Sequence, residues 1–311
     1  MASDRYPTTS EIREVGPRDG LQDEQPIPVE ARIRLIDALS ATGLRAIEVG
    51  SFIRPDLVPA MAGTDRVLAG ITRAPGVRYR ALAPNMRGAE LALQAGVDEL
   101  ELVVSVSDAH NRGNLNMSTE ASVDQIGRIV AVASEGVVPV EVIVATAFGC
   151  VYQGSIPTAD VVALARRLRD LGVATLSFAD TIGSASPPMV SALIDALEDA
   201  GWQADQLALH FHNTRGAGPA NIVVAAQRGV RRFDASIGGL GGCNFSPGAT
   251  GNVATEDIVH LLDSLGATTG VDLDALIGVA RDVETLIGRP LPGCLLRSSP
   301  WTGRPLLPGG P

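Results

Sequence analysis

Short apolar or β-branched runs alternate with amphipathic stretches from residue 11 to about residue 262, and no polar linker or low-complexity segment interrupts them. Parallel strands need long crossover connections, which are usually helices, so this alternation is typical of repeated βαβ units. Eight strands are the number that closes a (β/α)8 barrel. The eight runs that we predict to be strands are 11–15, 46–51, 77–83, 99–105, 140–147, 174–179, 206–211 and 232–237.

The sequence between the runs carries helix start and stop signals. Residues 28–42 begin at Pro28, repeat apolar side chains at helical spacing and stop before Gly43, as expected of a helix. Residues 160–171 and 187–200 repeat this pattern. A glycine that can take the left-handed conformation would turn the chain back toward the barrel before every second run. These glycines are Gly43, Gly96, Gly172 and Gly229.

The length of 311 residues fits one barrel of ~250 residues followed by an extension. A further helix is predicted over 273–287, where it would cover one side of the barrel, and the last residues are rich in Pro and Gly. We therefore expect a TIM-barrel domain with a covering C-terminal helix over residues 1–290 and a Pro/Gly-rich tail over 291–311.

Composition and charge narrow the class of protein. Hydrophobic residues make up 45% of the chain and charged residues 19%, which supports a large core and excludes an intrinsically disordered protein. The net charge of −10 repels phosphate backbones and anionic lipids, so neither nucleic acid nor membrane is expected as a partner, although small anions could bind at local arginine clusters. No apolar run approaches the ~18 uncharged residues of a membrane span, which favours a cytoplasmic protein.

The basic residues and the cysteines exclude several kinds of chemistry. All 25 basic residues are arginine, so a Schiff-base lysine, a Walker lysine and a pyridoxal-phosphate lysine are all excluded. The three cysteines, Cys150, Cys243 and Cys294, lie far apart and form no C-x-x-C pair. Cysteine chemistry is therefore expected to use a single thiol in a reducing compartment.

Residues capable of catalysis gather where the predicted strands end, which is the catalytic face of such a barrel. His210 and His212 are the most specific signal, because side chains two residues apart on a strand share one face and can bind one metal ion. A pair of hydrogen-bonded core histidines is the alternative. Asp19 and Asn252 would complete an oxygen-rich set of ligands, which favours Mg²⁺ or Mn²⁺ over a zinc–thiolate site.

Four further side chains are candidates for catalytic roles. Arg18 is placed to stabilise an oxyanion beside the metal, and a capping or salt-bridge role is the alternative. Glu48 and Asp180 fall in otherwise apolar strands, where a carboxylate is either paired with an arginine or has a raised pKa suited to proton transfer. Cys243 follows four glycines within five residues; a thiol in such a loop is more often exposed and reactive than buried and inert.

Four segments together resemble the 3-hydroxy-3-methylglutaryl-CoA lyase family, within a wider group of metal-dependent barrel enzymes that includes isopropylmalate and homocitrate synthases. They are EVGPRDGLQ at 14–22, ADTIG at 179–183, HFH at 210–212, and the stretch from GLGGC to GATGNVATED at 239–257. Their joint occurrence in this order is more specific than any one of them. The resemblance spans about residues 11–290.

The resemblance implies a lyase that cleaves a 3-hydroxy-3-carboxymethyl acyl-CoA into acetyl-CoA and a keto acid by retro-Claisen chemistry. It implies a CoA thioester as substrate, a bound divalent metal and, by analogy, a homodimer. Arg18 resembles the residue that stabilises the enolate oxygen, and Cys243 resembles the loop thiol that protonates the released carbanion. Carried over by motif, the metal ligands are Asp19, His210, His212 and Asn252, and the catalytic residues are Arg18, Glu48, Asp180, His210 and Cys243.

The sequence also departs from the family's pattern. We interpret lost hydroxyl donors and bulk at Val49 and Gly50, and an added charge at Arg215, as a change of acyl group. Arg112 stands in a segment that is usually rich in lysine, and it would contact a CoA phosphate or be solvated. The departures near the motifs are Val49, Gly50, Asn213, Arg215 and Asn244.

Two other functions remain open at this point. A condensing synthase would use the same metal site in the forward Claisen direction, and the HFHN order at 210–213 is similar to that branch. Cys243 and its glycine loop favour the lyase, because protonating a released carbanion needs an acid that a synthase can do without. A silent barrel that binds an acyl-CoA or a partner protein is the other alternative, and altered ligands would have indicated it; none is altered.

Overall fold

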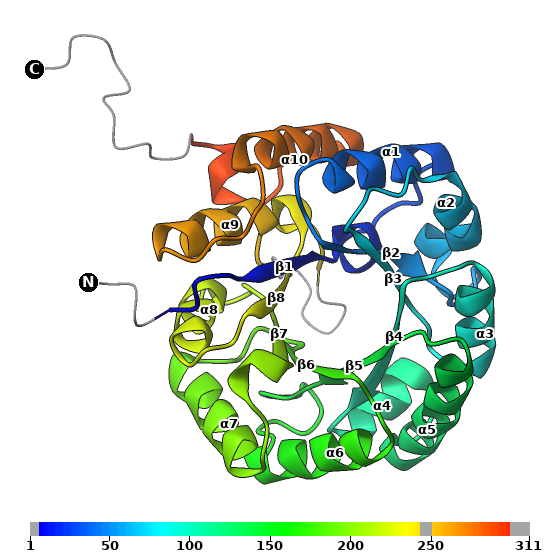
Figure 1. Cartoon of the computed structure of the whole chain (residues 1–311), viewed down its shortest axis with the longest axis vertical. Helices are drawn as coiled ribbons and strands as arrows, with labels where there is room; N and C mark the ends of the chain where they lie inside the picture. The colour runs from blue at the N-terminus through cyan, green and yellow to red at the C-terminus, as the bar shows by residue number, and fades with distance from the viewer. Residues whose placement is uncertain (1–5, 243–250, 299–311) are drawn as a thin grey trace, which may run out of the picture.

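In the computed structural model, eight parallel strands close into a barrel in the order β1 to β8 (Figure 1). The structure describes residues 6–242 and 251–298. The predicted (β/α)8 fold is confirmed, and each predicted run agrees with its strand to within two residues at either end. The strands are β1 Glu11–Glu14, β2 Ala46–Ser51, β3 Arg78–Leu82, β4 Glu99–Ser105, β5 Val140–Ala145, β6 Thr175–Asp180, β7 Leu207–Phe211 and β8 Arg232–Ala235.

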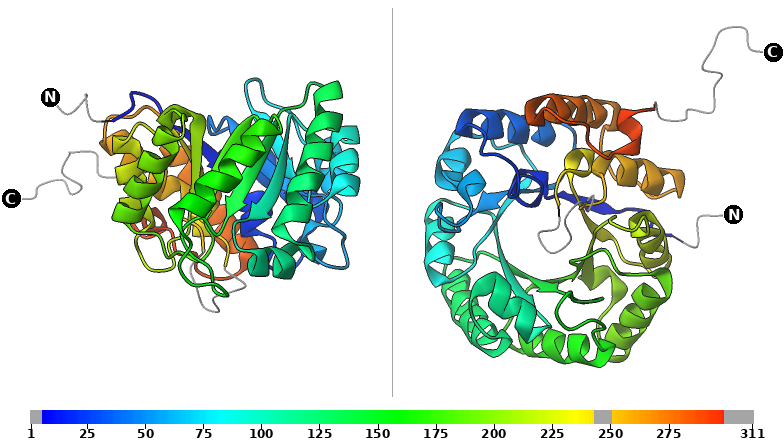
Figure 2. Two further views of the ribbon diagram at one scale, coloured as in Figure 1. Left: turned by 90° about the horizontal axis from the view of Figure 1, so that it is seen from below. Right: turned by 180° about the vertical axis from the view of Figure 1, so that it is seen from behind.

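Helices surround the barrel on its outside (Figures 1 and 2). The four glycines predicted to end helices all have left-handed backbone conformations, with φ between 76° and 92°. The predicted C-terminal helix is present as α10. The α-helices are α1 Val29–Ser40, α2 Thr64–Gly70, α3 Met86–Gln94, α4 Asp108–Leu115, α5 Thr119–Glu135, α6 Thr158–Asp170, α7 Pro187–Asp199, α8 Gly218–Gln227, α9 Thr255–Ser264 and α10 Leu273–Ile287.

The main apolar core lies between the strands and the surrounding helices. All six residues of β2 are buried, as expected for a parallel strand that is covered on both faces. Leu35, Ile36 and Leu39 on α1 are buried at helical spacing, which matches the stripe seen in the sequence. None of the described helices combines the length and the apolarity needed to cross a membrane.

A layer of paired charged side chains fills the middle of the barrel interior. Arg13 Nη1 lies 2.5 Å from Glu141 Oε2, and Arg13 Nη2 lies 2.5 Å from Asp234 Oδ1. Arg80 Nη2 contacts Glu101 at 2.6 Å and Glu141 at 2.7 Å. Burying ions is costly unless they are paired, and here each guanidinium bridges two carboxylates.

The chain after α10 packs back onto the barrel before the described residues end. Leu291, Leu295 and Leu296 are buried, and the side chain of Asp257 on α9 accepts hydrogen bonds from the backbone N–H groups of Cys294 and Leu295. Residues 291–298 of the expected tail therefore form part of the packed structure.

Candidate functional site

A π-helical turn, η1 at Gly16–Gly20, follows β1 and carries Arg18 and Asp19. Such turns interrupt regular structure and often occur at functional sites. The buried Glu14 fixes this turn, because its Oε1 accepts hydrogen bonds from the backbone N–H groups of Gly16 at 2.7 Å and Ile237 at 2.9 Å. Its Oε2 accepts from the Thr255 hydroxyl at 2.6 Å. Glu14 therefore ties η1 to the loop after β8 and to the start of α9.

The predicted metal ligands meet at the carboxyl end of the barrel. One ligand atom each from Asp19, His210 and His212 lie within 4.8 Å of one another, and His212 Nε2 is 4.0 Å from Asp19 Oδ2. His210 pairs with Asp234 across β7 and β8, and the Asp234 carboxylate lies 3.3 Å from His210 Nδ1. This contact leaves His210 Nε2 for the cluster, as in the carboxylate–histidine–metal arrangements of known sites.

Electrostatics keep Asp19 and His212 in the protonation states that metal binding requires. Burial, followed by the charge of His210, lowers the pKa of His212 to about 4, so its imidazole is neutral at pH 7. Burial alone would raise the pKa of Asp19, but Arg18 and then the two histidines hold it at about 2. The cluster therefore offers a carboxylate and a neutral imidazole.

Asn252 lies beside this cluster with its amide nitrogen toward it. Its Nδ2 donates to Asp19 Oδ2 at 2.7 Å and to the Leu240 carbonyl at 3.2 Å. The structure thus brings all four predicted ligands together, but it does not point the Asn252 oxygen at the cluster. Gly241 is needed here, because a Cβ on it would lie 2.7 Å from Asn252 Nδ2 and its φ is 130°.

Arg18 is buried between two carboxylates. Its Nε donates to Glu48 Oε1 at 2.6 Å and its Nη1 to Asp19 Oδ1 at 2.5 Å, and among the described residues Nη2 makes no hydrogen bond. Burial raises the pKa of Glu48 well above its usual value although Arg18 opposes this, and a hydrogen bond with Glu101 raises it further.

These contacts link both sides of the metal cluster through the barrel interior. On one side, the contacts join Asp19 to Arg18, Glu48, Glu101 and Arg80. On the other side, Glu141 joins Arg80 to Arg13, and Arg13 contacts Asp234, which contacts His210. We call this set the buried charge network. Its charged members are the guanidinium groups of Arg13, Arg18 and Arg80 and the carboxyl groups of Asp19, Glu48, Glu101, Glu141 and Asp234.

A cavity of about 370 Å³ opens over the cluster. Arg18, Asp19, His210 and His212 belong to its polar lining, and apolar side chains of the loop after β2 and of the end of α4 and the residues after it form an apolar wall. Those apolar side chains are Ile53, Leu57, Val58, Met61, Leu115 and Met117. Polar groups beside an apolar wall suit a ligand with a charged or carbonyl end and a hydrocarbon part.

Asp180 does not line this cavity. The inward positions of β6 are Ser177, which bonds to Arg13, and Ala179, which lines the cavity. Side chains alternate along a strand, so Asp180 points to the other side, where its Oδ1 accepts from the Ser184 N–H at 2.8 Å. Burial raises its pKa to about 6, and its Oδ2 has no partner among the described residues. Its role in proton transfer stays a prediction.

The interpretation of Val49 and Gly50 as acyl-pocket positions is wrong. Neither residue lines the cavity; Ser51 does. The pairing of β2 with β3 shifts register between Glu48 and Ser51, and a Cβ on Gly50 would lie 2.5 Å from both Arg32 Nη2 and Thr64 Oγ1. At this irregularity Gly50 faces α1 and α2 and not the cavity.

The remaining predicted residues lie farther from the cluster. Arg112 is exposed on α4, and its Nε donates to Asp108 at 2.7 Å, so a contact with CoA stays a prediction. Arg215 donates to the carbonyls of Ile182 and Gly183 and does not line the cavity. Asn213 receives a hydrogen bond from the Gly218 N–H. Cys243 and Asn244 lie outside the described residues.

Glu256 on α9 fixes the start of the glycine loop, because its Oε2 accepts from the Gly238 N–H at 3.0 Å. The sequence alone gave no reason to single it out or to single out Glu14, since both look like ordinary polar residues beside a helix or strand. Burial raises the pKa of Glu256 to about 8. In the unfolded chain the same carboxyl ionises near its usual, lower pKa.

We therefore expect the stability of the protein to fall as the pH rises toward 8, because the folded state holds a proton on Glu256 that the unfolded state has lost. Glu256→Gln should remove this contribution and keep an acceptor for Gly238. Thermal unfolding at pH 5 and pH 8 checks this: the midpoint of the variant should drop less between the two pH values than that of the parent. Equal drops would show that Glu256 is ionised in the fold.

Comparison with known proteins gives a consistent result. The HMGL-like family matches residues 10–283. A hydroxymethylglutaryl-CoA lyase of Bacillus subtilis is 44% identical over 288 residues, which cover 92% of this chain and 96% of that protein. A 3-hydroxy-3-isohexenylglutaryl-CoA/hydroxymethylglutaryl-CoA lyase of Pseudomonas aeruginosa is 42% identical over 284 residues, or 91% and 94% of the two chains.

A solved structure agrees with these sequence matches. An HMG-CoA lyase from Acinetobacter baumannii, in complex with coenzyme A and 3-methylmalate, superposes with a TM-score of 0.92. It is 39% identical in sequence, and the match covers 97% of this chain and 98% of that chain. The whole barrel, and not only its motifs, is therefore shared.

Proposed function

Because the chain belongs to the HMGL-like family, we propose that it is a divalent-metal-dependent carbon–carbon lyase that cleaves a 3-hydroxy-3-carboxymethyl acyl-CoA into acetyl-CoA and a keto acid. The observation that carries the proposal is the joint placement of Asp19, His210, His212 and Arg18 in one cavity with an apolar wall. A relative solved with coenzyme A supports the thioester.

The residues present fit a hard divalent cation such as Mg²⁺ or Mn²⁺. Asp19, His210 and His212 would hold it, with the oxygen of Asn252 as the fourth ligand after its amide turns. Two imidazoles with oxygen donors suit such an ion better than a thiolate zinc site does, and His212 Nδ1 has no partner among the described residues. When bound, the ion supplies a Lewis acid that polarises the substrate oxygens.

Retro-Claisen cleavage needs a base, an oxyanion partner and an acid. His210 or a carboxylate such as Asp180 stays the predicted acceptor of the proton from the tertiary hydroxyl, although Asp180 does not line the cavity described above. The carbon–carbon bond breaks, its electron pair becomes the thioester enolate, and the hydroxyl carbon becomes the keto group. Nη2 of Arg18, which makes no hydrogen bond to any described residue, would donate to the enolate oxygen, while Glu48 holds the guanidinium in place. The thiol of Cys243 then protonates the carbon to give acetyl-CoA.

The apolar wall indicates a branched acyl chain. The isohexenylglutaryl-CoA lyase of Pseudomonas aeruginosa shares 42% of its sequence with this chain, so a hydrocarbon branch longer than methyl is compatible with this family. Leu57 is 62% exposed at the rim of the cavity, where a longer branch would cover it. A contact of Arg112 with CoA phosphate, a homodimer and a cytoplasmic location stay predictions.

A panel of thioesters tests the proposal. Purified protein with Mg²⁺ or Mn²⁺ should release acetyl-CoA from 3-hydroxy-3-methylglutaryl-CoA or its 3-isohexenyl analogue, and chelation of the metal should stop the release. If acetyl-CoA appears from neither thioester, the lyase assignment fails. Release of free CoA from acetyl-CoA plus a keto acid would identify a condensing synthase instead, and binding without turnover would identify a silent barrel.

A further inference from the structure

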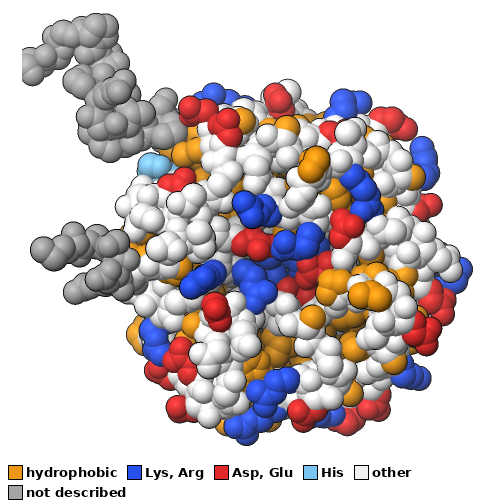
Figure 3. All heavy atoms as spheres, in the orientation of Figure 1, with side chains coloured by type: hydrophobic (Ala, Val, Ile, Leu, Met, Phe, Trp, Pro, Cys, Tyr) orange, Lys and Arg blue, Asp and Glu red, His pale blue; other side chains and the backbone are white. Residues whose placement is uncertain are grey.

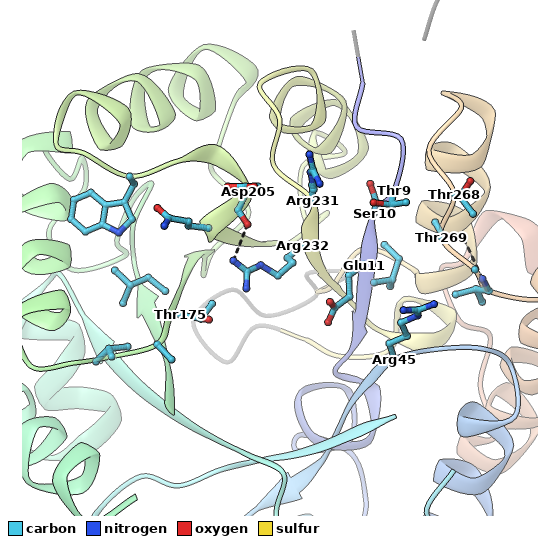
Figure 4. A pocket seen from close by; sticks show the side chains of 18 of the residues that line it. Thr9, Ser10, Glu11, Arg45, Thr175, Asp205, Arg231, Arg232, Thr268 and Thr269 are labelled. Atoms are coloured by element: carbon cyan, nitrogen blue, oxygen red, sulfur yellow. Dashed lines mark hydrogen bonds between the residues drawn. The ribbon is translucent and has the colours of Figure 1, made fainter. Parts of the chain in front are cut away.

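A second cavity lies at the amino-terminal ends of the strands, at the opposite end of the barrel from the metal cluster (Figure 4). Its volume is about 890 Å³. The starts of β1 and β6, the residues just before β7 and β8, and the connection between α9 and α10 line it. It shares no residue with the cavity over the metal cluster.

The lining of this cavity carries an excess of positive charge. Arg45, Arg169, Arg231 and Arg232 line it, against only Glu11 and Asp205 among acidic residues. The Glu11 carboxylate is already engaged by Arg78. Basic and acidic side chains gather over the centre of the barrel on this face (Figure 3). In a chain with a net charge of −10, such a local excess of arginine is unusual.

Two of these arginines lack anionic partners. Within the part of the chain that the structure describes, Arg45 and Arg231 make no ion pair or side-chain hydrogen bond. Arg169 differs, because its guanidinium lies 4.1 Å from the centre of the Trp202 ring. Arg45 and Arg231 lie on opposite sides of β1 in the lining of the cavity (Figure 4).

Two buried polar groups in the lining also lack partners. Ser10 is only 6% exposed, and its hydroxyl has no hydrogen-bond partner among the described residues. The same holds for Nε of Arg232, whose Nη2 donates to the Asp205 carbonyl at 3.0 Å. Buried donors are rarely left unpaired, and both of these unpaired donors belong to residues that line the cavity.

We propose that this cavity binds a small phosphate-bearing molecule. Phosphate carries more than one negative charge and several acceptor oxygens, which guanidinium groups match with paired hydrogen bonds. The hydroxyl groups of Thr9, Thr268 and Thr269 in the lining are further donors. At about 890 Å³, the cavity leaves room for an organic part beside the phosphate.

The proposed phosphate site lies next to the buried charge network, which extends to the metal cluster. Glu11 and Arg13 lie two residues apart on β1, as do Arg232 and Asp234 on β8, so each pair shares one face of its strand. The phosphate site is thus the layer directly beneath the buried charge network. It does not depend on the proposed lyase activity, and its failure would leave that activity untouched.

Titration with inorganic phosphate in the presence of Mg²⁺ tests the proposal, with potassium chloride at equal ionic strength as the reference. Calorimetry should show saturable binding to the parent and to the matched control Arg66→Gln/Arg87→Gln, whose arginines pair with Glu30 and Glu90 on the outer surface. Binding to Arg45→Gln/Arg231→Gln should be ~10-fold weaker for each arginine removed. Equal affinities in all three proteins would overturn the proposal.

A second measurement needs no variant. Phenylglyoxal modifies accessible arginines, and phosphate should slow its reaction with Arg45 and Arg231 but not with Arg66 and Arg87, as read by mass spectrometry. Protection of Arg18 alone would place the anion at the catalytic end and contradict the proposal. Stronger protection by citrate than by phosphate at equal charge would show that the ligand is a polycarboxylate, and would also contradict it.

Discussion

His212→Ala should yield a folded protein whose affinity for divalent metal is more than ~100-fold weaker than that of the parent, because even residues behind the ligands change metal affinity by up to that factor. His212 is buried in the cavity beside Asp19, and no described residue satisfies its Nδ1. Its removal therefore costs little in protein contacts. Metal analysis after dialysis and a binding titration measure the loss, and turnover should fall with it.

His260→Ala is the matched control for this variant. His260 lies on α9, away from the cluster, and its removal should change neither metal content nor turnover. If His212→Ala retained one metal ion per chain at the affinity of the parent, the pair of histidines would be a structural feature of the core. The mechanism built on the cluster would then be wrong.

Arg18→Gln should lower kcat by ~10²–10³-fold, the cost of removing one oxyanion donor. It should also destabilise the protein by up to ~3–5 kcal/mol, because it leaves the buried Glu48 and Asp19 carboxylates without their cation. Steady-state kinetics and denaturant unfolding measure the two effects separately.

The double variant Arg18→Gln/Glu48→Gln separates catalysis from folding. Glu48 is 1% exposed, and neutralising it removes the unpaired charge, so much of the lost stability should return. Turnover should stay low, because the donor to the enolate oxygen is still absent. Recovery of both stability and turnover would mean that Arg18 acts only as a structural partner of Glu48.

The strands, the helix ends and the metal cluster could be predicted because each depends on local signals. A run of β-branched residues, a glycine after a helix and an H-x-H at a strand end all act within a few residues. The charged interior could not be predicted in the same way. A polar residue that alternates with apolar ones, such as Arg13 in β1, looks the same whether it faces solvent or the inside of a barrel.

Where Gly50 and Asp180 face could not be predicted from the sequence, because it depends on the phase of each strand. Both residues lie where a strand approaches the catalytic end, but the direction of a side chain there depends on a single residue of register. An irregularity in β2 turned Gly50 outward, and regular alternation in β6 did the same to Asp180. Sequence patterns locate strand ends to within about two residues, which is too coarse to fix that phase.

We expect the buried charge network to release protons when the protein binds a divalent cation. Fully ionised, its three guanidinium groups and five carboxylates leave two negative charges uncompensated. Without a divalent ion, this negative charge favours protons on nearby groups, and the pKa values of Glu48, Glu141 (to about 7) and His210 are raised. Binding of the divalent ion should thus release protons. Calorimetry in buffers of different ionisation enthalpy would count the protons released per ion bound. At lower pH the same exchange would run in reverse, and protons would displace the divalent ion from its site.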